Sequence, residues 1–265
     1  MANWRALVVT AHPDDMEFGA AGTLAKWAAQ GAEITLCIGT DGSTGTQDRS
    51  LMGAPLHEIR IKESQRAADL VGIKELIWLG LRDGYVEYTL DLRREIARLF
   101  RRYRPHRFMV MDPTPTIDLF INHPDHRAIG QASLDVSMTA GTTPGHFPEL
   151  LEEGLDPWRG LREVWIAGPG LKPRVVDITD TIDTKIEALR CHQSQVGENA
   201  DEIAEFVRQY CAEAGKPAGF DYAESFQVIS QGPGFHAGEQ EDDVDLSELA
   251  TAPLDARSTA PAPEH

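Results

Sequence analysis

The chain has 265 residues and carries 42 Asp and Glu against 25 Lys and Arg, a formal charge of −17 at pH 7. This balance argues against a nucleic acid or an anionic membrane as partner, because a net negative field repels polyanions. No apolar run approaches the roughly 18–20 residues that span a bilayer, and the N-terminal residues lack the layout of a secretory signal peptide. Three cysteines without metal-knuckle spacing indicate no disulfide framework. We expect a cytoplasmic protein.

Short apolar runs alternate with helix-like segments along most of the chain. The first run, Arg5–Thr10, is rich in Val and Leu, which is typical of a strand covered on both faces. The repeated β-α-β rhythm predicts an α/β fold with a Rossmann-like, mostly parallel sheet and helices on both faces. The expected strands are 5–10, 33–39, 75–79, 107–111, 164–167 and 174–178; the expected helices are 19–30, 58–70, 92–103, 124–138, 181–193 and 201–213.

Two segments depart from this rhythm. Residues 142–162 are rich in Pro and Gly, which leaves open whether they form a lid over a site. Residues 232–265 hold eight acidic residues against Arg257 alone and few large apolar side chains, too few to offset the entropy of ordering. We therefore expect one domain over residues 1–231, followed by an acidic, disordered tail over 232–265.

The first expected strand leads into a cluster of ionisable residues, Ala11-His12-Pro13-Asp14-Asp15. In open α/β sheets, ligands gather at the carboxyl ends of the strands, so this position is favoured for a site. A divalent cation explains the cluster, because imidazole nitrogen and carboxylate oxygen are ligands that zinc accepts. The alternative is that Asp14 or Asp15 caps the following helix while His12 is exposed.

A second cluster, His123-Pro124-Asp125-His126, follows the fourth expected strand. Two clusters at two strand ends can meet over one edge of the sheet, and together they supply a His₂Asp ligand set. Three protein ligands and one open position are the arrangement of a catalytic zinc site. The alternative for His123 and His126 is capping and surface exposure at the start of a helix. The two clusters together favour the metal site.

These residues resemble the PIG-L/LmbE-like de-N-acetylases, which are zinc hydrolases that remove acetyl groups from substrates containing N-acetylglucosamine. The family includes deacetylases of mycothiol and bacillithiol synthesis. The family motif A-H-P-D-D stands complete at residues 11–15, and residues 17–23 resemble its usual continuation. The motif H-x-D-H matches residues 123–126, and K-x-x-A-L-x-x-H-x-S-Q is similar to residues 185–195. The resemblance spans roughly residues 4–230. One departure is Met16, where many members have Glu; here the acid follows at Glu17.

The resemblance implies a role for each matching residue. Asp14 would be the general base that deprotonates the zinc-bound water, and His123 would stabilise the oxyanion or protonate the leaving amine. Asp125 would be a carboxylate that orients a histidine, either His123 or a metal ligand. Arg60 and His192 are candidates for contact with the substrate. The implied zinc ligands are His12, Asp15 and His126.

The resulting expectation is a metal-dependent N-deacetylase that acts on a small N-acetylated amino sugar, with Zn²⁺ as cofactor and Fe²⁺ or another divalent ion as an alternative. An amidase for a larger amide, such as a thiol-sugar conjugate, and a non-catalytic metal- or sugar-binding protein are other readings. Asp14 speaks against the non-catalytic reading, because the metal does not require it. A nucleotide-binding oxidoreductase is disfavoured because the first β-α turn lacks G-x-G-x-x-G. The oligomeric state stays open, with a homo-oligomer among the options.

Overall fold

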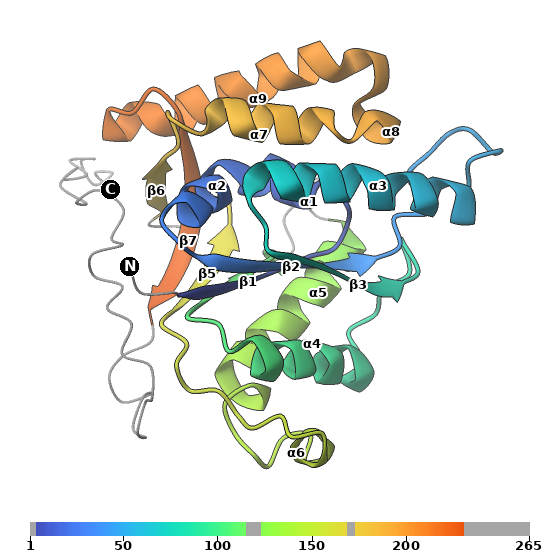
Figure 1. The fold of residues 1–265 in the computed structure, drawn as a ribbon, viewed down its shortest axis with the longest axis vertical. Coiled ribbons are helices and arrows are strands. Elements are labelled where there is room, and N and C mark those ends of the chain that lie inside the picture. The colour runs from blue at the N-terminus through green and yellow to red at the C-terminus, as the bar shows by residue number, and fades with distance from the viewer. Residues whose placement is uncertain (1–3, 115–122, 169–172, 231–265) are drawn as a thin grey trace, which may run out of the picture.

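The computed structural model describes residues 4–114, 123–168 and 173–230, and these form a single mixed sheet between two helical layers (Figure 1). The expected tail at 232–265 lies outside the described residues. The strands are β1 (Arg5–Thr10), β2 (Glu33–Thr40), β3 (Glu75–Leu81), β4 (Arg107–Val110), β5 (Glu163–Ala167), β6 (Arg174–Asp177) and β7 (Ala223–Ser230). The helices are α1 (Asp15–Gly19), α2 (Ala21–Ala29), α3 (Ala54–Val71), α4 (Leu90–Tyr103), α5 (Pro124–Asp135), α6 (Glu149–Glu152), α7 (Ile182–Arg190), α8 (Gln193–Val196) and α9 (Ala200–Gly215).

The strand order is β3-β2-β1-β4-β5-β7-β6, with β1 to β5 parallel and β7 antiparallel to both of its neighbours. The predicted α/β fold and mostly parallel sheet are confirmed. The chain builds outward from β1 to β3 and then returns to the other side of β1 with β4. The carboxyl ends of β1 and β4 therefore border the point at which the strand order reverses, where open α/β sheets bind ligands.

Both faces of the sheet are covered, which explains the continuous apolar runs of the central strands. All residues of β1 after Arg5 are buried. In Figure 1, α2, α3, α7 and α9 lie on one side of the sheet and α4, α5 and α6 lie on the other. Trp27, Trp165 and Phe226 anchor one core, and Phe100 and Phe108 anchor the other. Among the described helices, none is both long enough and apolar enough to cross a membrane.

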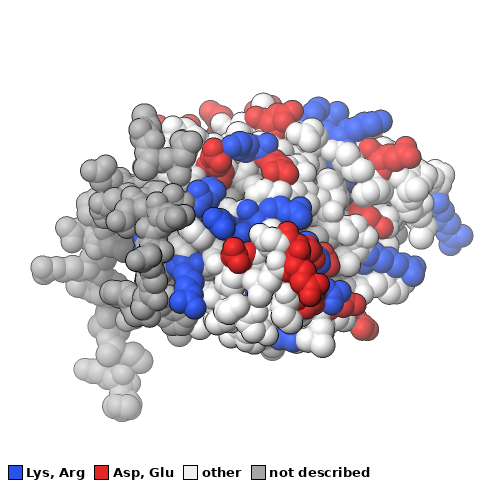
Figure 2. Space-filling model, turned by 60° about the horizontal axis from the view of Figure 1, so that its bottom comes forward, with Lys and Arg blue, Asp and Glu red and all other residues white. Residues whose placement is uncertain are grey.

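Charged side chains of both signs share the surface of the layer that carries α4. Figure 2 shows basic and acidic side chains next to one another on this side of the molecule. Arg98 of α4, for example, pairs with Glu153 at an Nε–Oε2 distance of 2.8 Å. Pairing of this kind divides the surface charge into small areas, which fits the expectation of a small-molecule partner better than that of a polyanion.

Several element boundaries differ from the prediction. The helix expected at 19–30 is α2, and the separate short helix α1 precedes it, because the backbone breaks at Ala20 with φ −151° and ψ 0°. The strand β7 was not predicted, since its sequence AESFQVIS carries a buried glutamate, Glu224, on the side that a strand pattern would fill with an apolar residue.

The Pro- and Gly-rich segment 142–162 lies at the amino edge of the sheet, away from the carboxyl ends of the strands. The guanidinium of buried Arg101 donates to the carbonyls of Thr143 and His146 at 3.0 and 2.6 Å. The indole of Trp158 donates to the carbonyl of Pro105, just before β4. The structure thus gives this segment a packed position on the α4 side, and does not place it as a lid over the predicted site.

A buried ion pair joins β7 to α7, and its glutamate also contacts α2. The ammonium of Lys185 lies 2.7 Å from Glu224 Oε1, and both side chains are almost fully buried. The Glu224 carboxylate also accepts the backbone N–H groups of Gly22 and Thr23, at 3.1 and 2.7 Å, in the first turn of α2. Glu224 therefore satisfies orphan donors of a helix N-terminus while it neutralises Lys185.

Replacement of Lys185 by Met is expected to lower the free energy of unfolding by about 3–5 kcal/mol, because it leaves the Glu224 carboxylate buried without a counterion. Urea denaturation followed by circular dichroism measures the change. The matched control is Lys74→Met, which removes an exposed ion pair to Glu33 (exposed fractions 61% and 36%); it is expected to cost less than about 1 kcal/mol. Equal effects of the two substitutions would contradict this account of Glu224.

Candidate metal centre and active site

The turn after β1 presents three ionisable side chains at the carboxyl edge of the sheet. Asp14 has a left-handed backbone with φ 99°, and Asp15 begins α1. The Asp15 Oδ2 atom accepts the backbone N–H groups of Ala11 and His12 at 3.0 and 2.7 Å. The aspartate thus closes the turn with one oxygen, and its second oxygen is available for another contact.

The first turn of α5 supplies the second cluster from the next strand of the sheet. The ring nitrogens His12 Nδ1 and His126 Nε2 lie 3.1 Å apart, His126 Nε2 lies 3.2 Å from Asp15 Oδ1, and His12 Nδ1 lies 3.7 Å from Asp15 Oδ2. The structure therefore brings together the three residues that the resemblance implies as metal ligands, from two segments more than 100 residues apart.

This triangle fits a divalent cation. Ligand atoms at about 2.0–2.2 Å from a tetrahedral ion lie roughly 3.3–3.6 Å from one another. The separations of 3.1 Å between the two ring nitrogens and 3.2 Å between His126 Nε2 and Asp15 Oδ1 are close to this range. Two imidazole nitrogens that face each other at 3.1 Å also need either a proton or a cation between them. Three protein ligands that leave one position for water or substrate would be the arrangement of a catalytic centre.

Two carboxylates set the orientation of His12. Its Nε2 atom lies 3.2 Å from Asp125 Oδ2 and 3.2 Å from Asp83 Oδ1. These acceptors keep a proton on Nε2, so the Nδ1 lone pair of a neutral ring points toward the triangle. Burial alone would lower the pKa of His12, but hydrogen bonds with Asp125, Asp15 and Asp83 raise it to about 12. A cation at Nδ1 would therefore have to displace a proton.

Asp15 is held as a carboxylate. Burial by itself would raise the pKa of Asp15, but the charges of His126 and His12 and their hydrogen bonds hold it well below its usual range. An ionised oxygen is the form that binds a metal ion. The electrostatics of the site thus keep this ligand ready.

Asp14 lies beside the triangle but outside it. Its Oδ2 atom is 3.1 Å from the guanidinium of Arg60, which also donates to the carbonyl oxygens of Gly42, at 3.1 Å, and Pro13. Burial raises the pKa of Asp14 to about 7, against the opposing charge of Arg60. A carboxylate with a pKa near neutrality is suited to accept a proton and release it again.

His123 and Asp125 occupy the start of α5. The His123 side chain is 42% exposed, and its Nδ1 atom accepts the backbone N–H of Asp125 at 3.2 Å. The neutral ring therefore carries its proton on Nε2. Burial, followed by the charge of His12, lowers the pKa of His123. Asp125 lies closer to His12, at 3.2 Å, than to His123, at 3.8 Å, so the carboxylate mainly orients a candidate ligand.

A second triad, His12, His123 and Asp125, also has its donor atoms within 4.8 Å of one another. It uses Asp125, however, whose oxygens accept the backbone N–H groups of Gly84 and Val86 at 2.7 and 3.0 Å. It also shares His12 with the first triad. We therefore treat the triad of His12, Asp15 and His126 as the candidate metal centre.

Arg60 and His192, the candidates for substrate contact, are both buried, with exposed fractions of 3% and 0%. Arg60 holds Asp14, as described above, and His192 Nε2 lies 3.1 Å from Glu17 Oε1. The structure gives these two residues partners within the protein. Contact of either with a substrate stays a prediction.

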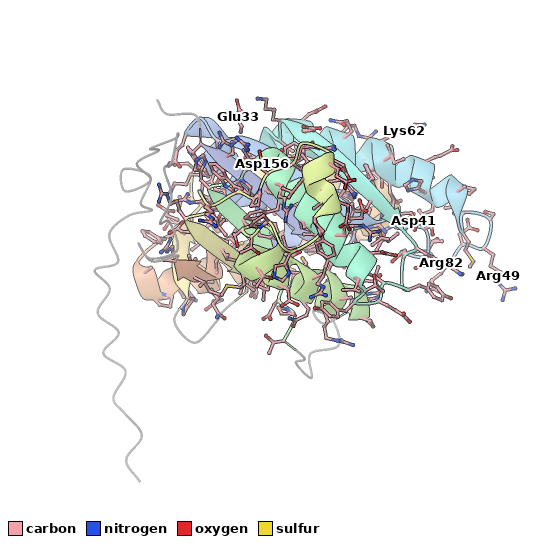
Figure 3. The ribbon with its side chains drawn as sticks, turned by 90° about the horizontal axis from the view of Figure 1, so that it is seen from below. Glu33, Asp41, Arg49, Lys62, Arg82 and Asp156 are labelled. Atoms are coloured by element: carbon pink, nitrogen blue, oxygen red, sulfur yellow. The ribbon has the colours of Figure 1, made fainter. Side chains whose placement is uncertain are left out.

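Asp83 is a residue of the site that sequence reasoning missed. It follows β3, is 4% exposed, and its Oδ2 atom accepts the N–H and O–H of Thr44 at 3.0 and 2.8 Å. In Figure 3, Asp41 and Arg82, which follow β2 and β3, lie toward one end of the molecule, and Glu33, which begins β2, lies toward the other. The sequence did contain a signal for Asp83, because this residue also follows a predicted parallel strand and so lies at the same edge of the sheet.

The fold and this edge define an α/β protein with a candidate catalytic metal centre, and comparison with known proteins gives its family. The model of the family PIG-L, GlcNAc-PI de-N-acetylase, matches residues 7–137. A diacetylchitobiose deacetylase of Thermococcus kodakarensis is 32% identical over 226 residues, which cover 85% of this chain and 83% of the relative. The chain belongs to the PIG-L family, so the expected family is confirmed.

Two further proteins support this family assignment. A 1D-myo-inositol 2-acetamido-2-deoxy-alpha-D-glucopyranoside deacetylase 2 of Saccharopolyspora erythraea is 30% identical, covering 76% of this chain and 88% of the relative. The structure of N,N'-diacetylchitobiose deacetylase from Pyrococcus horikoshii, in complex with its inhibitor MPG, superposes with a TM-score of 0.79 at 31% identity. That match covers 85% of this chain and 84% of the other.

Replacement of His126 by Ala is expected to weaken divalent metal binding by more than about 100-fold, because it removes one of three ligands rather than a supporting contact. Competition with a chromogenic chelator measures the affinity for Zn²⁺. The matched control is His146→Ala, at an exposed histidine outside the site, which should bind as the unaltered protein does. Equal affinity of His126→Ala and the control would remove His126 from the ligand set.

Proposed function

We propose that this protein is a metal-dependent hydrolase that removes the N-acetyl group from a glucosamine-containing small molecule, with Zn²⁺ as the metal. The observation that carries the proposal is Asp14, a carboxylate next to three candidate ligands but bound to Arg60 instead. A purely structural or storage site has no use for such a group. The relatives named above support the reaction class, since their names describe deacetylases of N-acetylated glucosamine derivatives.

The residues divide the work of amide hydrolysis. His12, Asp15 and His126 would hold the cation, which supplies a Lewis acid that activates water and polarises the amide carbonyl. Asp14 accepts the proton of the attacking water, and Arg60 keeps its carboxylate turned toward the site. His123 offers its Nε2–H to the developing oxyanion or to the departing amine. Asp125 and Asp83 hold His12 by its Nε2 atom, so that its Nδ1 atom would be available to the cation.

The substrate class follows from the relatives and from the charge of the chain. Diacetylchitobiose and the inositol glycoside share a 2-acetamido-2-deoxyglucose unit. A chain with a charge of −17 favours a neutral sugar, whose deacetylated product is cationic, over a polyanion. We therefore propose a neutral N-acetylglucosamine glycoside as the substrate.

The first test is release of acetate from N-acetylglucosamine, N,N'-diacetylchitobiose and an N-acetylglucosaminyl inositol, with the metal content measured in parallel. The expected result is release from at least one substrate at about one metal ion per chain, stopped by a chelator and restored by Zn²⁺. Bound metal without release from any of the three would overturn the proposed substrate class. Release that a chelator does not affect would overturn the metal dependence.

Asp14→Ala tests the base. It is expected to lower kcat by about 10²–10⁴-fold, the usual contribution of a general base, while the protein keeps its metal ion, because Asp14 lies outside the ligand triangle. The matched control is Asp69→Ala, at an exposed aspartate of α3, for which kcat should not change. A kcat of Asp14→Ala within tenfold of the control would falsify the assignment.

A further inference from the structure

The third motif, residues 185–195, has no part in the chemistry proposed above, yet its side chains reach the elements that carry the site. Lys185 Nζ donates to the carbonyl of Phe18 at 2.8 Å, and His192 Nε2 lies 3.1 Å from Glu17 Oε1; both partners belong to α1. The backbone N–H of Ser194 donates to Glu63 Oε1 at 2.8 Å on α3, the helix that carries Arg60. The motif thus ties α7 and α8 to the elements behind Asp14 and Asp15.

The helix α1 needs such support. It has five residues, far fewer than a helix that is stable by itself. It follows the left-handed backbone of Asp14, a conformation that persists only where the surroundings hold it. Asp15, a candidate metal ligand, is its first residue, and Asp14 immediately precedes it. Any rotation of α1 about its axis therefore moves both carboxylates.

The pair of Glu17 and His192 is the contact best placed to prevent this rotation. Glu17 lies one helical turn beyond Asp14, and its N–H donates to the Asp14 carbonyl at 3.0 Å. The exposed fractions of Glu17 and His192 are 2% and 0%, so neither side chain presents a surface to a substrate. A buried carboxylate needs a partner, and His192 is the partner that the described contacts give to the side chain of Glu17.

We propose that His192 is a positioning residue: through Glu17 it fixes the orientation of α1, and with it the carboxylates of Asp14 and Asp15 relative to His12 and His126. In its effect on turnover this inference rests on the proposed function. In its effect on metal binding it does not, because Asp15 belongs to the candidate metal centre whatever the reaction.

The test compares two substitutions of nearly equal size. His192→Gln keeps an N–H donor at the position of Nε2, and His192→Met fills the same space without one. Gln193→Ala is the matched control, at the next residue, whose exposed side chain donates to the carbonyl of Arg190 at 2.7 Å. Circular dichroism first establishes that each variant is folded.

Zn²⁺ affinity is then measured by chelator competition, without substrate. We expect His192→Met to weaken the affinity about tenfold, as the loss of a supporting contact around a metal site does. The Zn²⁺ affinity of His192→Gln should stay within about threefold of the affinity of the control. Affinities of His192→Met and the control that agree within twofold would overturn the proposal.

Turnover at saturating Zn²⁺ separates positioning from substrate contact. We expect His192→Met to lower kcat about tenfold with little change in KM, and His192→Gln to restore kcat. A rise in KM with an unchanged kcat would mean that His192 contacts the substrate, and would overturn the proposal. If the unaltered protein releases no acetate, the proposed function fails, and the metal affinities still decide the role of His192.

Discussion

The parallel pairing of β1 with β4 is the constraint on which the candidate site depends. It places Val8 opposite Met109, so the two chains leave the sheet next to each other although about 100 residues separate them. One exit carries His12 and Asp15 and the other leads to His126. A shift of this register by one residue along β4 would move its chain by about 3.3 Å, which is as large as the separations between the ligand atoms.

The site also concentrates negative charge on side chains that are mostly buried. Asp14, Asp15, Asp83 and Asp125 all lie within or beside the candidate centre, and Arg60 brings a permanent positive charge against one of them, Asp14. The remaining negative charge is what a divalent cation neutralises. Binding of such an ion would therefore be coupled to the folding of this edge, since the unfolded chain offers no such cluster.

The sequence was informative where chemistry is local and less so where it depends on packing. The motifs at 11–15 and 123–126 led to the candidate ligand triad, and the β-α-β rhythm led to the sheet, because both are visible within short segments. Asp83 was missed because a single aspartate after a strand is common and acquires meaning only beside His12. β7 was missed because Glu224 interrupts its apolar face, and only the distant Lys185 explains the interruption.

The four aspartates show how one residue type takes different roles at one sheet edge. Asp15 gives one oxygen to backbone N–H groups and turns the other toward His126, so it can hold a metal ion. Asp83 and Asp125 are occupied by N–H groups and by His12, so they orient His12. Asp14 is paired with Arg60 and lies outside the candidate ligand triad. Its raised pKa suits it to accept a proton and release it again. Their partners, rather than their spacing in the chain, distinguish these roles, and the buried contacts behind α1 keep the partners in place.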